Sequence, residues 1–96
     1  MLKINDFIKT NGIKIHTNEI AFSKLDIFKF IEILESNKKF ILGGDIWYKK
    51  DKYFFITYKN WYSELGILSQ KESIKVSINY IEKYVKNDEY IVIIYK

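Results

Sequence analysis

Apolar side chains recur at helical spacing in two segments of the N-terminal half of the chain. The first segment, residues 4–11, stops at Gly12 and predicts a short helix. The second begins after Ser23, whose hydroxyl suits a helix N-cap, and continues to residues 35–37. Its inward stripe consists of Ile27, Phe30, Ile31 and Leu34. The pattern therefore predicts two amphipathic helices before the middle of the chain.

The third periodic segment, residues 70–86, predicts the longest helix. Ser69 and Glu72 stand three positions apart at its start, which is the spacing of a capping box. Its apolar stripe consists of Ile74, Ile78, Ile81 and Val85. Residues 90–95 then form a continuous apolar run that is too short for a helix, and they predict a central strand buried on both faces.

Runs of β-forming residues predict strands elsewhere. Residues 39–49 and 53–58 predict a hairpin joined across a charged turn at 49–52, and residues 13–17 predict a short edge strand. The order of these elements predicts an α+β fold. We expect a two-layer sandwich, with the helices packed on a small, mostly antiparallel sheet of three to four strands.

The composition indicates one domain spanning residues 1–96. Hydrophobic residues make up 48% of the chain, which is enough for a single core. There is no cysteine, which excludes disulfides and cysteine-based zinc sites. The N-terminus lacks the apolar run of a signal peptide, and no segment reaches transmembrane length, so we expect a cytoplasmic protein that does not contact membranes. The sequence leaves open export by a route that needs no N-terminal signal.

The formal net charge is +4, and all sixteen basic residues are lysines. Arginine, which supplies the planar fork for bidentate recognition of phosphate and guanine, is absent. Lysines still bind polyanions as point charges. The charge alone therefore offers little support for a nucleic-acid partner.

The reactive side chains argue against most classes of enzyme. His16 is the only histidine and has no nucleophile motif near it, so we expect a surface or structural role. Asp45 and Glu64 could form a carboxylate pair for acid–base chemistry. Asp45 follows two glycines, however. At this position a role in hydrogen bonding, either within the fold or to a partner, is favoured over a catalytic role. The sequence predicts no catalytic residue, no metal site and no cofactor.

Aromatic residues crowd the segment 47–62. Alternate strand positions face opposite sides of a sheet, so these rings cannot all be core, and some are expected at the surface beside lysines. Such a surface suits single-stranded nucleic acid, with bases stacked on rings and phosphates on lysines. It equally suits a protein partner held by aromatic anchors. A core with scattered surface tyrosines is the plainer alternative.

Two adjacent glycines and an aspartate, Gly43-Gly44-Asp45, interrupt the first strand of the predicted hairpin. Glycine weakens a strand, and the usual reason for keeping it is a bulge or the close approach of another group. A bulky candidate follows in the aromatic segment. Its residues are Tyr58, Asn60, Trp61 and Tyr62.

These two segments, followed by Ser77 in the third helix and the final apolar strand, resemble the immunity protein 40 family of bacterial polymorphic toxin systems. The resemblance covers residues 20–96. The lysine-rich hairpin and the absence of arginine depart from the family pattern. The resemblance implies a protein without catalytic activity that neutralises the C-terminal domain of a cognate secreted toxin by stoichiometric binding. A small lysine-rich nucleic-acid-binding domain is the alternative.

The residues shared with the family need not be those that contact a toxin. The glycine pair, Asp45 and Trp61 are interpreted as residues that make the fold. The candidate contact residues are Trp47, Tyr48, Lys49, Lys50, Lys52, Tyr62 and Glu64. An acidic patch on and before the second helix is a further candidate, against the alternative of a solvated helix face. Its members are Glu19, Asp26, Glu32 and Glu35. We expect a monomer or a weak homodimer.

Overall fold

The computed structural model describes residues 3–15 and 18–96 of the chain, which form three helices and five strands. In chain order these are α1 (Ile4–Asn11), β1 (Ile13–Lys14), β2 (Ile20–Ser23), α2 (Lys24–Ser36), β3 (Ile41–Lys50), β4 (Tyr53–Tyr62), α3 (Gln70–Tyr84) and β5 (Glu89–Tyr95). The predicted α+β class and the three predicted helices are confirmed.

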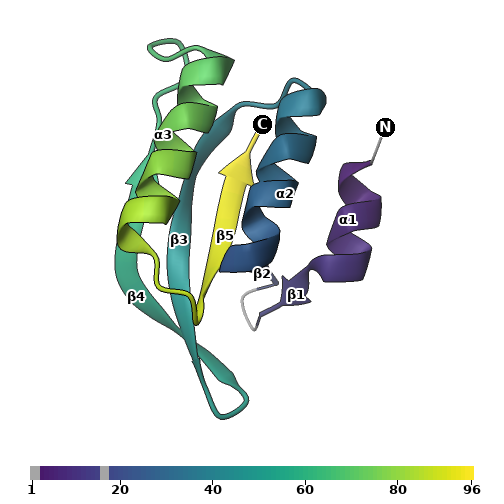
Figure 1. The fold of residues 1–96 in the computed structure, drawn as a ribbon, viewed down its shortest axis with the longest axis vertical. Coiled ribbons are helices and arrows are strands. Elements are labelled where there is room, and N and C mark those ends of the chain that lie inside the picture. The colour runs from purple at the N-terminus through teal and green to yellow at the C-terminus, as the bar shows by residue number, and fades with distance from the viewer. Residues whose placement is uncertain (1–2, 16–17) are drawn as a thin grey trace.

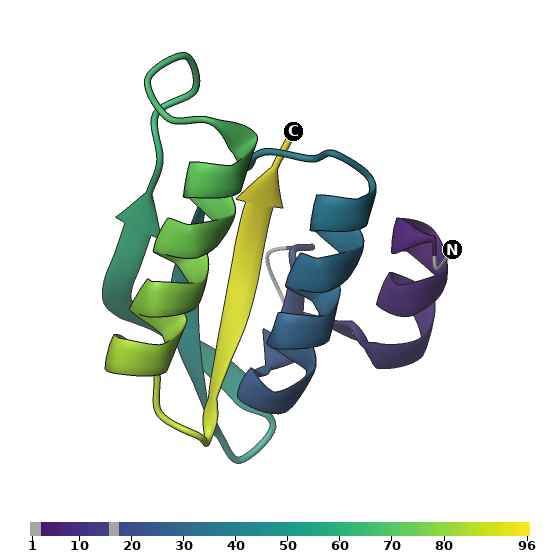
Figure 2. The same ribbon diagram turned by 45° about the horizontal axis from the view of Figure 1, so that its top comes forward.

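The strands form one antiparallel sheet in the order β1-β2-β5-β3-β4. Figures 1 and 2 show α2 and α3 side by side over one face of this sheet, with β5 running behind the space between them. The final apolar run is therefore a central strand, as predicted, but it is not buried at every position, because Ile94 is 46% exposed. The closed end of the β3–β4 hairpin projects beyond the helices (Figure 1).

The expected strand count of three to four was wrong, because the described sheet contains five. The missing element is β2, which is four residues long and leads directly into α2. A run this short shows no readable alternation, and its strand conformation depends on pairing with β5, where Ala21 lies opposite Val92. In the predicted strand 13–17, Ile13 and Lys14 form β1, whereas His16 and Thr17 lie outside the described residues.

Strand β4 extends four residues past the predicted end of the hairpin. The predicted strand stopped at Tyr58, which adopts a positive φ of 68°. The pairing of β3 with β4 shifts register between Asp45 and Trp47, so the chain passes through a bulge and continues as a strand. The segment with Asn60 and Trp61 thus belongs to the sheet, although it lies beyond the predicted end of the strand.

The two longer helices, α2 and α3, begin directly after the N-cap residues that the sequence predicted. The Ser23 hydroxyl accepts a hydrogen bond from the Asp26 backbone N–H at 3.2 Å. The Ser69 hydroxyl accepts one from Glu72 N–H at 3.1 Å, and the Glu72 carboxylate accepts one from Ser69 N–H at 2.8 Å. This reciprocal pair satisfies donors that a helix N-terminus otherwise leaves without partners.

The main core lies between the helices and the sheet. Phe22 of β2 and Phe30 of α2 stack with ring centroids 4.4 Å apart, and Phe7 of α1 packs 5.6 Å from Phe22. Burying one such side chain stabilises a fold by roughly 1.5–3 kcal/mol. The fully buried aliphatic side chains of this core include Ile27, Ile31, Leu34, Ile41, Ile46, Ile81 and Ile91.

A smaller cluster lies on the opposite face of the sheet. Its buried members are Ile15, Ala21, Trp47 and Val92, with Phe54, Ile56 and Tyr90 packed against them, and none comes from a described helix. We call this side of the sheet the helix-free face. Because successive strand positions alternate between faces, the register assigns each strand residue to the helix-covered or the helix-free side.

Candidate functional site

The two unusual segments are direct neighbours in the sheet. Gly43 lies opposite Tyr62, Gly44 opposite Trp61 and Asp45 opposite Asn60. Each pair joins β3 to β4, and its two residues occupy the same face of the sheet. The two segments therefore form one paired unit. Strand alternation divides this unit into an inward half, on the helix-covered side of the sheet, and an outward half, on the helix-free side.

In the inward half, Gly44 makes room for an indole. A β-carbon on Gly44 would collide with Cη2 of Trp61, and would lie 2.7 Å from its Cζ3 and 2.8 Å from the Val92 carbonyl oxygen. The Trp61 side chain, 7% exposed, belongs to the main core. Its approach to the sheet requires that residue 44 have no side chain.

A chain of hydrogen bonds joins this indole to α3. Trp61 Nε1 donates to Ser77 Oγ at 3.0 Å, and Ser77 Oγ donates to the Ser73 carbonyl at 2.7 Å. Ser73 Oγ in turn accepts from the Ile41 backbone N–H at 3.2 Å. The indole also stacks on Tyr80 with centroids 5.1 Å apart. Ser77, selected from the sequence without a defined role, is therefore the partner of a buried donor.

The outward half faces the opposite way. Gly43, Asp45, Asn60 and Tyr62 occupy the helix-free side, on alternate positions from Gly44 and Trp61. Burial raises the pKa of Asp45, and the nearby charge of Glu19 raises it further. The carboxylate that interacts with Asp45 is thus Glu19, preceding β2, and the sequence analysis had instead considered Glu64.

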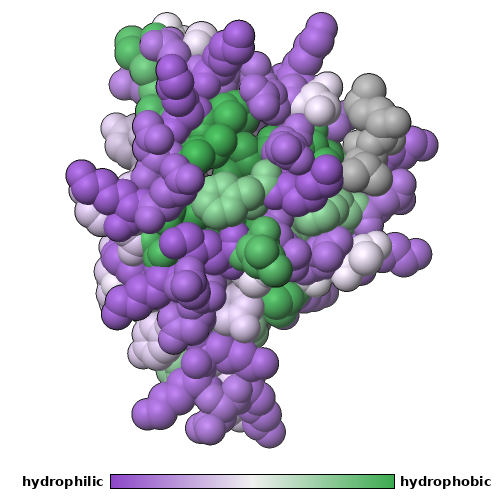
Figure 3. Space-filling view, in the orientation of Figure 1, coloured by the Kyte–Doolittle hydropathy of each residue, from purple (hydrophilic) through white to green (hydrophobic). Residues whose placement is uncertain are grey.

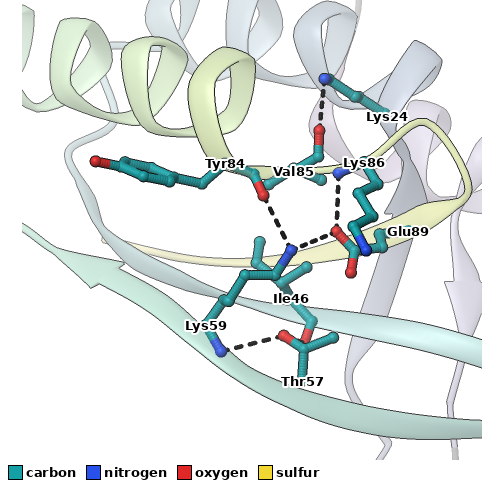
Figure 4. A network of polar contacts seen from close by, with 8 residues as sticks. All are labelled: Lys24, Ile46, Thr57, Lys59, Tyr84, Val85, Lys86 and Glu89. Atoms are coloured by element: carbon teal, nitrogen blue, oxygen red, sulfur yellow. Dashed lines mark hydrogen bonds and ion pairs between the residues drawn. The ribbon is translucent and has the colours of Figure 1, made fainter.

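A second polar group, centred on Lys59 and Glu89, was not predicted from the sequence. Lys59 Nζ lies 2.7 Å from Glu89 Oε1 and donates to the Tyr84 carbonyl at 2.9 Å (Figure 4). Glu89, 7% exposed, also accepts from Lys86 N–H at 2.8 Å. Burial tends to raise the pKa of Glu89, but the hydrogen bonds and charges of Lys59 and Lys86 outweigh it, so the pKa lies below its usual value.

This group secures the C-terminal end of α3. The Tyr84 carbonyl accepts from Lys59 of β4, and the Val85 carbonyl accepts from Lys24 Nζ of α2 at 2.6 Å (Figure 4). Lysines are favourable there because the last carbonyls of a helix lack intrahelical partners and carry partial negative charge. Only the tertiary fold brings these residues together, so no local sequence signal could have indicated the arrangement.

The predicted contact residues of the hairpin divide between surface and interior. Trp47 is 6% exposed and packs in the cluster on the helix-free face, so the expectation that it lies at the surface was wrong. Tyr48 is partly exposed and stacks on Phe55 at 5.4 Å. Lys49, Lys50 and Lys52 are exposed around the hairpin turn, and the projecting part of the molecule is hydrophilic in Figure 3.

The predicted acidic patch does not form one surface. Glu32 is exposed on α2 and pairs with Lys29 at 3.2 Å, and Glu35 is exposed at the end of the same helix. Glu19 instead interacts with Asp45 on the helix-free side. Glu64 is exposed beyond the end of β4.

The helix-covered side has an open groove between α2 and α3. It is lined by Glu35 of α2 and, from α3 and its cap, by Ser69, Lys71, Glu72, Ile74, Lys75 and Ile78, around a volume of about 500 Å³. Hydrophobic side chains come to the surface between the two helices in Figure 3. In the part of the chain that the structure describes, no helix is both long and apolar enough to cross a membrane, and no three potential metal ligands come together.

Comparison with known proteins gave one family. The family model described as Immunity protein 40 matches residues 7–95. This range includes the segment with the two glycines and the aromatic segment that pairs with it. No curated protein and no solved structure gave a significant match.

Proposed function

The chain belongs to the immunity protein 40 family, and from this membership we propose that it binds and neutralises a cognate secreted bacterial toxin. In this proposal the chain acts inside the cytoplasm of the cell that makes the toxin. It forms a stoichiometric complex with the C-terminal toxin domain, as a monomer or a weak homodimer, and carries out no chemistry of its own. Gly44, Trp61 and Ser77 then serve the fold that presents the binding surface.

The observation that carries the proposal is the family match over nearly the whole chain. The exposed side chains agree with a protein-binding role. Tyr58 is 83% exposed and Tyr62 is 79% exposed, and the apolar Leu65 and Ile67 are exposed in the loop that follows β4. Tyrosine is enriched at protein interfaces because it combines a large apolar area with a polar tip.

A lysine-rich nucleic-acid-binding domain is the alternative, and the hairpin lysines are what favours it. Two of them already lie over aromatic rings of the hairpin. Lys49 Nζ is 5.7 Å from the centre of the Phe54 ring, and Lys52 Nζ is 5.8 Å from that of Tyr53. Single-strand binders need ring faces that are free to stack on bases, so these contacts reduce the ring area that the hairpin offers to a nucleic acid.

The test is calorimetric titration of the protein with the toxin domain encoded beside its gene, at low and high salt. We expect a one-to-one complex with nanomolar affinity that changes little with salt. A polyanion complex through lysines would instead weaken steeply as salt rises. Absence of binding to the toxin domain, together with salt-sensitive binding to single-stranded oligonucleotides, would replace the proposal with the alternative.

A further inference from the structure

We propose that the closed end of the β3–β4 hairpin, residues 48–55, docks the toxin, and that the toxin surface it binds is acidic. We call these residues the hairpin arm. This inference rests on the proposed function, because the partner is the toxin that the chain neutralises. The arm projects from the domain, carries exposed rings on one of its sides, and concentrates positive charge at its turn.

The arm is a two-stranded extension of the five-stranded sheet. Strand β3 pairs with β5 as far as Tyr48, which lies opposite Glu89, the first residue of β5. Beyond this point the two described strands of the hairpin pair only with each other, and the arm extends past the helices (Figure 1). Each side of the arm is thus open to a partner unless side chains of this chain cover it.

On the helix-free side, the ring of the arm is already engaged within the protein. Phe54 packs against the cluster on that face and makes an edge contact with Tyr90, with ring centroids 5.2 Å apart. Lys49, which lies opposite Phe54 in the hairpin, places its Nζ 5.7 Å from the centre of the same ring. This side of the arm therefore offers a partner little ring surface.

The other side of the arm carries three exposed rings. Tyr48 lies opposite Phe55, and Lys50 lies opposite Tyr53, so two cross-strand pairs follow one another along this side. Tyr48 and Phe55 stack with ring centroids 5.4 Å apart, yet they are 42% and 44% exposed, and Tyr53 is 59% exposed. The helices bury Ile46 on the same side of β3, two residues before the arm. Exposed rings that lie together are typical of a protein-binding surface, where aromatic side chains act as anchors.

The charge of the arm is positive. Its turn contains three exposed lysines and one exposed aspartate, namely Lys49, Lys50, Asp51 and Lys52. These four residues carry a formal charge of +2, which is half of the +4 of the whole chain. Among the described residues, none of the three lysines forms an ion pair. The nearby carboxylate of Glu89 is already paired with Lys59, so the lysines of the arm are available to acidic groups of a partner.

An acidic surface of the toxin matches both features of the arm. An apolar side chain of the toxin would pack on the stacked rings of Tyr48 and Phe55, and carboxylates around it would meet Lys50 and Lys52. Opposite charges across an interface speed association and fix the orientation of the two proteins. A second copy of this chain does not match, because an interface between two identical arms would bring the same lysines together.

Other exposed surfaces described above do not select a partner in this way. The groove between α2 and α3 mixes two lysines with two glutamates, so its charge favours neither sign. These residues are Lys71, Lys75, Glu35 and Glu72. Further along β4, Tyr58 and Tyr62 are exposed, but Lys59 between them is engaged with Glu89. The hairpin arm combines exposed rings with an excess of one charge.

Two double variants test the charge of the arm in calorimetric titrations with the toxin domain encoded beside the gene. Lys50→Gln with Lys52→Gln removes two charges from the arm, and Lys71→Gln with Lys75→Gln removes two from exposed positions of α3. Both lower the formal net charge from +4 to +2. We expect the arm variant to bind about three- to tenfold more weakly at low salt, and the α3 variant to bind like the wild type. The difference should shrink at high salt, while the complex as a whole persists because the rings anchor it.

A second pair of variants tests the rings. Phe55→Thr removes an exposed ring from the arm, and Ile94→Thr removes a comparably exposed apolar side chain from the helix-free face of β5. Threonine suits strands, so both variants should fold, and thermal unfolding verifies this. We expect Phe55→Thr to weaken toxin binding by about tenfold or more at either salt concentration, and Ile94→Thr to leave it unchanged.

The outcomes separate this inference from the proposed function. If the wild type binds the toxin domain and the arm variants bind equally well, the docking surface is refuted and the proposed function stands. Equal weakening by the two lysine pairs would assign the effect to net charge and refute an acidic contact at the arm. Oligonucleotide binding that Phe55→Thr abolishes would make the arm a nucleic-acid surface instead. If the wild type does not bind the toxin domain, the proposed function fails and this inference fails with it.

Discussion

The Trp61 indole lies in the space that a β-carbon on Gly44 would need. The two residues are paired across β3 and β4, and the indole continues to Ser77 through a hydrogen bond of 3.0 Å. One missing side chain in the sheet therefore allows a large side chain of the next strand to join sheet and helix. The contact explains why a glycine persists within a buried strand, where it otherwise weakens the structure.

Replacing Gly44 by alanine should lower the free energy of unfolding by about 1–3 kcal/mol, because the added methyl overpacks the space held by the indole. Urea denaturation measures this change. The matched experiment introduces Gly44→Ala into a Trp61→Phe background, where the smaller ring leaves more room. We expect a smaller loss of stability there, since the effects of substitutions at two residues in contact do not simply add. Equal costs in both backgrounds would show that the indole is not the obstacle.

Replacing Ser77 by alanine should destabilise the protein by about 1–3 kcal/mol, because the buried Trp61 Nε1–H loses its acceptor. Trp61→Ala should cost more, about 3–5 kcal/mol, since it also removes the packed ring. Chemical denaturation of both variants gives the two values. In a Trp61→Phe background, which has no indole N–H, Ser77→Ala should cost less. If Trp61→Ala kept wild-type stability but lost toxin binding, Trp61 would be a contact residue.

The ion pair of Lys59 and Glu89 should make stability depend on pH in the acid range. The folded state lowers the pKa of Glu89, so folding favours its charged form. This contribution is complete above the ordinary pKa of a glutamate and is lost as pH falls through the lower, folded value. In Lys59→Met, the burial of Glu89 is no longer offset by this lysine, and its pKa should rise. The variant should therefore lose less stability than the wild type between neutral pH and about pH 4.

At neutral pH, Lys59→Met should destabilise the protein by about 1–3 kcal/mol, because it removes the partner of a largely buried carboxylate. Lys29→Met is the control, since it breaks an exposed pair with Glu32 and should change stability by at most about 0.5 kcal/mol. Urea denaturation of the wild type and of the two variants, at neutral pH and at about pH 4, measures these differences. Equal effects of the two substitutions would contradict a structural role for the Lys59–Glu89 pair.

Tyr58 should be a site where substitution stabilises the fold. Its backbone has a φ of 68°, which is unfavourable for a bulky residue, and its side chain is largely exposed. Tyr58→Asn should raise the free energy of unfolding by up to about 1 kcal/mol, because asparagine tolerates this conformation better. Tyr53→Asn, in the extended part of β4, should be neutral or destabilising because asparagine is disfavoured in strands. Thermal denaturation of the two variants makes the comparison, and a lower melting temperature for Tyr58→Asn would contradict it.

The helices, the hairpin and the central strand were predictable because their signals are local. Capping by Ser23, and by Ser69 with Glu72, depends on residues within one turn, and the apolar stripes follow the helical period. The run at residues 90–95 is apolar at every position, which suffices to predict a strand in the middle of the sheet, although Ile94 is 46% exposed on the face that the helices leave open. Two local predictions failed, at β2 and at the end of β4, where pairing with β5 and the bulge at Tyr58 decide the conformation.

The sequence by itself thus determined the fold class, the family and the residues that merited attention. Tertiary structure decided how those residues act, because the face that a strand residue occupies depends on register and bulges. It turned Gly44 and Trp61 inward and Asp45 and Tyr62 outward, buried Trp47, and brought Glu19 beside Asp45 and Lys59 beside Glu89. These contacts join residues distant in the chain, whose approach depends on the packing of the whole domain.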